Sequence, residues 1–111
     1  MRIVPGSVLV VGLLCNLPAL AQSDKAALAE YWGKLHGGAI YCRINSAHEF
    51  GLAAANYFRR VGSFEKLRDA YGIAMLNTAH QSPGREVGGS CDGVRKRFGQ
   101  VFEDLKKGTV E

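Results

Sequence analysis

The stretch that decides the fold is residues 40–80, IYCRINSAHEFGLAAANYFRRVGSFEKLRDAYGIAMLNTAH. Its apolar residues recur at steps of three and four on both sides of one short break, Gly62-Ser63, and this spacing is typical of one face of an α-helix. Gly62 suits the left-handed residue that follows a helix, and Ser63 suits the N-cap of the next one. The stretch therefore predicts two helices, and the short connection between them favours an antiparallel pair.

The start of the first of these two helices has two interpretations. The apolar phase is unbroken from Ile40 to Val61, which favours one continuous helix that includes Cys42. Ser46 and Glu49 fit a capping box, which would begin the helix at Ser46 and leave Cys42 before it. We prefer the continuous helix because the phase does not change at Ser46.

Two further helices flank this pair. The segment 23–36, SDKAALAEYWGKLH, has helical spacing, with Trp32 expected against the core and Gly37-Gly38 as the predicted stop. Residues 81–84, QSPG, end the second predicted helix of the pair, and the glycine-rich segment 85–89 is expected to be mobile.

Ser90 is a candidate cap for a last helix, whose inner stripe comprises Cys91, Val94, Phe98, Val101 and Leu105. Without any strand pattern, the chain is predicted to be all-α: three main helices plus an N-terminal helix.

The first 21 residues are expected to be a cleavable signal peptide, which leaves residues 22–111 as a single helical domain. Arg2 is the only charge before Asp24, and the apolar run 8–14 is shorter than a membrane span. Ala19-Leu20-Ala21 places small residues where a signal peptidase cleaves. Two alternatives stay open: an uncleaved anchor, and a lipoprotein with Cys15 as the lipidated residue, although the bulky Leu14 does not suit it. The expected location is periplasmic or secreted.

Once the signal is removed, the only cysteines are Cys42 and Cys91. Exported proteins meet an oxidising environment, so we expect these two to form a disulfide. The loop it closes is about 50 residues long, for which the chain-entropy model gives roughly 4 kcal/mol of stabilisation. A redox-active pair is the alternative, but there is no Cys-x-x-Cys motif to depress a thiol pKa.

The charge of the domain is mildly positive. Without residues 1–21 there are 13 Lys and Arg against 10 Asp and Glu. The basic residues form short clusters, 59–60, 95–97 and 106–107, mixed with acidic residues, which is typical of solvated helix faces rather than of a nucleic-acid footprint. We therefore predict no nucleic-acid partner and no stable membrane insertion after signal removal. A weak affinity for acidic partners stays open.

Three histidines are the obvious candidates for chemistry: His36, His48 and His80. Cys42 and His48 are six residues apart, so on one helix they would lie about 240° apart and could not share a ligand face. His-x-x-x-His pairs, phosphate loops and Gly-x-Ser-x-Gly elbows are all absent from the sequence. The sequence therefore predicts no catalytic residue, no metal site, no cofactor and no enzymatic activity.

Two family resemblances are visible. The predicted helix pair resembles a single tetratricopeptide unit in placing Phe58, Gly62, Phe64, Tyr71 and Ala74, but it has Leu67 where the repeat has a small residue and lacks the terminal proline. A solenoid needs about three such units.

The layout of the whole domain resembles that of the HdeA-type acid-stress chaperones of the bacterial periplasm, which are small exported helical chains with two cysteines about fifty residues apart. In this chain the second cysteine begins the last helix, and the residues that carry the resemblance there are Cys91, Phe98, Val101, Phe102, Leu105 and Lys106-Lys107. That resemblance implies a dimer that opens at low pH to expose apolar surface to unfolding clients. The chain departs from this family in its mildly basic charge and in the glycine-rich segment before Cys91.

These observations favour an exported, non-enzymatic protein that binds a protein partner or acts as a chaperone, with a homodimer as one expected assembly. The residues expected at the interaction surface are Trp32, Tyr41, Tyr57, Arg59 and Arg60. The alternative is an immunity or inhibitor protein directed at a secreted enzyme. A third hypothesis, a carrier of a metal or small molecule, rests on the histidines alone.

Overall fold

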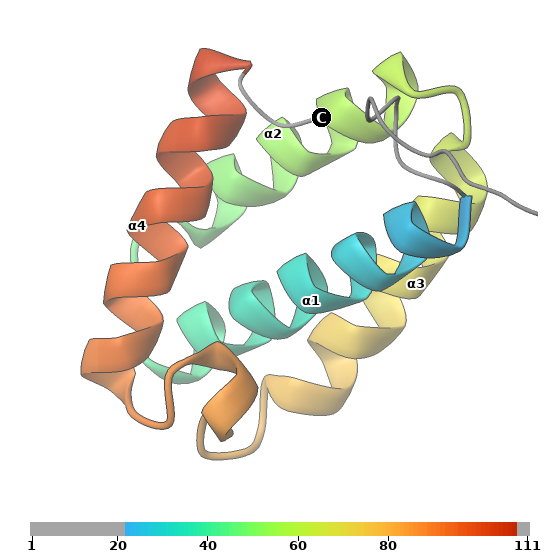
Figure 1. Cartoon of the computed structure of the whole chain (residues 1–111). Helices are drawn as coiled ribbons and strands as arrows, with labels where there is room; N and C mark the ends of the chain where they lie inside the picture. Colours follow the sequence, from blue (N-terminus) through green and yellow to red (C-terminus); the bar gives the residue numbers. More distant parts are fainter. Residues whose placement is uncertain (1–21, 109–111) are drawn as a thin grey trace, which may run out of the picture.

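The computed structural model describes residues 22–108, which fold into four α-helices and one short 3₁₀ turn (Figure 1). No strand occurs in this range, so the predicted all-α class and helix number are confirmed. Residues 1–21, the predicted signal peptide, and residues 109–111 lie outside the described part. The elements are α1 Gln22–Tyr41, α2 Ala47–Arg60, α3 Phe64–Thr78, η2 Arg85–Val87 and α4 Cys91–Lys107.

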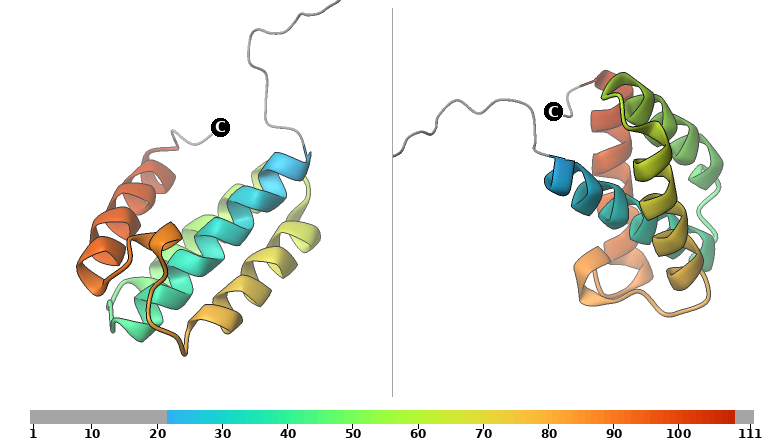
Figure 2. Two further views of the ribbon diagram at one scale, coloured as in Figure 1. Left: turned by 60° about the horizontal axis from the view of Figure 1, so that its bottom comes forward. Right: turned by 90° about the vertical axis from the view of Figure 1, so that its right-hand side faces the viewer.

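Helix α1 is the centre of the arrangement. It contacts α2, α3, α4 and η2, and its most extensive contact is with α3. Figure 2 shows α3 alongside α1 at one edge of the molecule and α4 at the opposite edge. The short α2–α3 connection favoured these two helices as the main pair, but α2 contributes far less to the packing of α3 than α1 does.

Two aromatic clusters fill the core. In one, the Trp32 ring stacks on Phe58, with 5.9 Å between centroids, and meets Tyr57 edge-on at 5.1 Å. In the other, Phe50 of α2 stacks on Phe98 of α4 at 4.5 Å. Trp32, Phe50, Phe58 and Phe98 are all buried, so the apolar stripes read from the sequence do face inward.

The predicted stop at Gly37-Gly38 is wrong, because α1 continues through both glycines to Tyr41. Gly33 and Gly37 lie where α1 packs against α3. A Cβ on Gly33 would collide with the Tyr71 carbonyl oxygen, and a Cβ on Gly37 would lie 2.7 Å from the Met75 carbonyl oxygen. The absent side chains therefore let the backbones of α1 and α3 approach closely.

The preferred continuous helix from Ile40 is also wrong, because α2 begins at Ala47 with Ser46 as its N-cap residue. Helix α1 ends in a Schellman motif: the Ile44 N–H donates to the Ala39 carbonyl and the Arg43 N–H donates to the Ile40 carbonyl. Arg43 has a φ of 60°, which turns the chain out of the helix. The capping box therefore placed the start of α2 correctly, but the Ser46 side chain does not make the capping hydrogen bond that defines such a box.

The remaining predicted ends agree with the structure. Gly62 has a φ of 82°, and Ser63 is the N-cap residue of α3, although its side chain makes no capping bond. The Ser90 hydroxyl accepts a hydrogen bond of 3.0 Å from the Gly93 N–H at the start of α4. Val87 of η2 is buried, so the glycine-rich segment is anchored to the core at one point.

Candidate interaction surface

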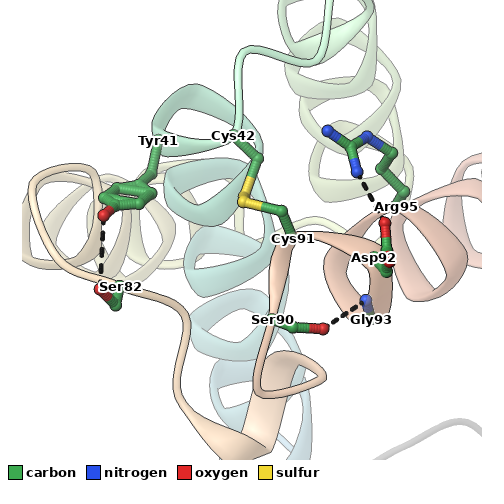
Figure 3. The surroundings of a disulfide bond; sticks show 8 residues. All are labelled: Tyr41, Cys42, Ser82, Ser90, Cys91, Asp92, Gly93 and Arg95. Carbon is green, nitrogen blue, oxygen red and sulfur yellow. Dashed lines mark hydrogen bonds and ion pairs between the residues drawn. A yellow bond between two sulfur atoms is a disulfide. The ribbon is translucent and has the colours of Figure 1, made fainter.

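The disulfide lies where the end of α1 meets the start of α4 (Figure 3). It joins Cys42 to Cys91, with 5.6 Å between the Cα atoms. The predicted pairing is confirmed, but the helices it links differ from those expected. Cys42 follows the last residue of α1, so the bond ties α4 to α1 and not to α2. Nearby, the Tyr41 and Ser82 hydroxyls share a hydrogen bond of 3.3 Å.

The five residues predicted for an interaction surface do not form one surface. Trp32 and Tyr57 are each only 2% exposed, so their expected place at the surface is wrong: both are part of the core. Tyr41 is 42% exposed but lies beside the disulfide (Figure 3). Arg59 and Arg60 are exposed at the far end of α2, a helix roughly 20 Å long.

Arg59 and Arg60 lie against aromatic rings. The Arg59 guanidinium is 4.7 Å from the centroid of Phe64, and the Arg60 guanidinium is 5.6 Å from that of Tyr57. A third guanidinium, that of Arg68, lies 5.4 Å from the same Phe64 centroid. Arg68 also pairs with Asp69, whereas none of the ion pairs within residues 22–108 involves Arg59 or Arg60.

Sequence reasoning missed the aliphatic residue that extends this cluster. Leu52 is 54% exposed on α2, and Asn56 and Arg59 follow it at steps of four and three, so the three share one outward face. The Asn56 amide oxygen accepts a hydrogen bond of 3.1 Å from Arg59. Leu52 does not follow the three-and-four spacing of the buried residues of α2, and this spacing in the sequence could have identified it as exposed. We call the following set the α2 surface: Leu52, Asn56, Arg59, Arg60, Phe64 and Arg68.

Two more large aliphatic residues are exposed on α3. Ile73 is 63% exposed and Leu76 is 65% exposed, on the side of the helix away from its buried residues Leu67, Tyr71 and Ala74. Their positions fall outside the stripe of buried residues, which is again visible in the sequence. They form a second, separate apolar patch.

The histidines are not gathered at one place. His36 of α1 is partly buried, and a hydrogen bond of 2.5 Å joins its Nδ1 to the Tyr71 hydroxyl of α3. Burial, with a smaller contribution from His48, lowers the pKa of His36, and burial raises the pKa of Tyr71. The neutral forms are therefore favoured, with the tyrosine O–H donating to the imidazole. His48 and His80 are exposed.

The lowered pKa of His36 predicts a stability that depends on pH. The unfolded chain binds this proton more readily than the folded one, so the contribution of His36 is complete above about pH 6.5 and is lost as the pH falls below it. We expect the melting temperature to drop between pH 7 and pH 5, and to drop less in His36→Gln. His80→Gln is the matched control and should keep the full drop. Equal pH dependence in all three proteins would contradict this assignment.

Within residues 22–108, no three His, Cys, Asp or Glu side chains come close enough together to hold a metal ion. In the same range, none of the helices combines the length and the apolar character needed to cross a membrane. The prediction that the protein has no enzymatic activity stays a prediction.

Comparison with known proteins gave no match: no family model fits the sequence, and no curated protein or solved structure is similar to it at a significant level.

Proposed function

We propose that the chain is an exported, periplasmic protein without enzymatic activity that binds other proteins in a chaperone-like manner. The observation that carries this proposal is the α2 surface, where an exposed leucine shares a helix face with Arg59, one of three arginines that lie against aromatic rings. The resemblance to HdeA-type chaperones supports it in layout. The disulfide supports export, because such bonds persist in oxidising compartments.

The composition of the α2 surface suits protein recognition. Arginine and aromatic residues are enriched in protein interfaces, and charged residues other than arginine are depleted at their centres. A guanidinium that stacks on a ring keeps its N–H edge available for a carboxylate, and the ring restricts its motion. Arg59 and Arg60 have no carboxylate partner among the described residues, so the surface suits a partner that presents acidic groups beside an apolar segment.

The proposal can be tested by light scattering with thermally unfolding citrate synthase and acid-unfolded malate dehydrogenase as clients. The mature protein should reduce aggregation, and Leu52→Gln/Arg59→Glu should lose at least half of this effect because the exposed apolar side chain and one arginine of the surface are both removed. Gln100→Glu, an exposed change on α4, is the matched control and should behave as the native protein. Circular dichroism should show the same helix content in all three.

Two results would count against the proposal: no reduction of aggregation at neutral or acidic pH, or equal activity of the native protein and the α2-surface variant.

A second candidate function, an immunity or inhibitor protein, is favoured by the same arginines, since arginine is common among residues that dominate the affinity of tight complexes. Gene neighbourhood separates the two candidates. A gene for a secreted hydrolase or toxin next to this one would favour inhibition, and the mature protein should then inhibit that enzyme in a manner abolished by Arg59→Glu.

A further inference from the structure

The outer face of α3 carries a short stripe of complementary residues. Asp69, Ile73, Leu76 and His80 follow one another at steps of four, three and four. At 100° per residue these positions fall within about 60° of one another around the helix axis. Thr78 ends the helix, but Ala79 keeps helical dihedrals, so His80 continues the phase. All four side chains are exposed.

This stripe is complementary to itself when two copies of the helix run antiparallel. With the two-fold axis placed between residues 74 and 75, Ile73 of one copy lies opposite Leu76 of the other, and Asp69 lies opposite His80. The centre is then aliphatic, and each end pairs a carboxylate with an imidazole N–H. Asp69 also forms an exposed ion pair of 3.2 Å with the neighbouring Arg68, and exposed pairs of this kind are weak.

The surroundings of the stripe leave room for a second copy. Helix α3 lies at an edge of the molecule, with α1 on one side (Figure 2). Ile73 borders a hollow of about 290 Å³ between α3 and α1, in which the partner's leucine can be accommodated. The small residues Ala70 and Ala74 of α3 also line this hollow, together with Glu30 and Lys34 of α1.

From this geometry we infer that the protein forms a homodimer through an antiparallel α3–α3 contact centred on Ile73 and Leu76, with Asp69–His80 pairs at its two ends. A contact confined to one helix per subunit falls at the small end of specific interfaces, so the dimer dissociates on dilution. The apolar centre of this contact, Ile73 and Leu76, shares no residue with the α2 surface, although Asp69 at its end pairs with Arg68 of that surface. Variants at Leu76 and at Leu52 therefore test the dimer and the proposed function separately.

Sedimentation equilibrium of the purified mature protein over a wide concentration range tests the inference. We expect a monomer–dimer equilibrium for the native protein. Leu76→Lys should weaken association by roughly tenfold or more, because it places a charge at the apolar centre. Leu52→Lys makes the same change on α2 and should leave the equilibrium unaltered. Circular dichroism checks that each variant is folded.

A charge exchange tests the register. Asp69→Lys and His80→Glu should each weaken the dimer, since each removes one partner of the end pairs, and the double variant should restore association to within about threefold of the native value by re-forming the pairs in the opposite sense. A strictly monomeric native protein would overturn the inference, as would unchanged association in Leu76→Lys. Failure of the double variant to recover would overturn the proposed register. If Leu76→Lys changed only the binding of another protein, the face would belong to that partner instead.

Discussion

Reduction of the Cys42–Cys91 disulfide is expected to lower the free energy of unfolding by about 4 kcal/mol, since the bond closes a loop of about 50 residues whose entropy in the unfolded chain is otherwise regained. In a domain of this size, that corresponds to a fall in melting temperature of about 15–30 °C. The measurement is a pair of thermal melts followed by circular dichroism, with and without reductant.

The double variant Cys42→Ser/Cys91→Ser is the control for this experiment. It should melt near the temperature of the reduced native protein and should not respond to reductant. A difference of only one or two degrees between oxidised and reduced protein would show that the packing of α4 on α1, and not the covalent link, holds the two helices together.

Replacement of both Gly33 and Gly37 by alanine is expected to destabilise the domain by about 2–6 kcal/mol, which is roughly 1–3 kcal/mol for each overpacked site. The new methyl groups would meet the Tyr71 and Met75 carbonyl oxygens of α3, which belong to the backbone and cannot move aside by a change of rotamer. The two helices would have to separate. Chemical denaturation followed by tryptophan fluorescence measures the effect, since Trp32 lies in the core.

Gly72 and Gly99 provide the matched control because nothing lies within 4 Å of the position that a Cβ would occupy at either site. Alanine at both should stabilise the protein by up to roughly 1 kcal/mol for each helix-interior glycine. If the Gly33/Gly37 variant were also more stable than the native protein, the close approach of α1 and α3 would be disproved.

The sequence predicted most of the fold because its signals were local. The periodic stripes identified the buried face of α2, α3 and α4, and Ser90 was recognised as a cap because its hydroxyl acts three residues away. The pairing of Cys42 with Cys91 followed by elimination, since the domain has no other cysteine.

The ends of α1 and α2 could not be predicted for a physical reason. Glycine usually occupies the left-handed position that ends a helix, but here Arg43 occupies it, while Gly37 and Gly38 remain inside the helix. Glycine at these positions is explained by the neighbouring helices, since Gly37 faces α3 and Gly38 packs against Val94 of α4. Contacts between helices that are far apart in the chain cannot be predicted from the spacing of residues within one helix.

The candidate surface was only partly predictable. Arg59 and Arg60 were recognised as an exposed basic pair, but the aromatic residues assigned beside them, Trp32 and Tyr57, belong to the core. Residue type alone does not separate a buried aromatic ring from an exposed one, because both kinds occur on amphipathic helices. Leu52 was missed because the periodic pattern was used only to find buried residues, and an apolar residue outside that pattern was not assigned to the surface.

The central claim, that the α2 surface binds other proteins, is tested most directly by site-specific photocrosslinking in the cells that natively produce this chain. A photoreactive phenylalanine analogue placed at position 52 should give adducts with proteins of other sequence, and the same group at position 100 on α4 should give none. Adducts at both positions, or at neither, would contradict the claim.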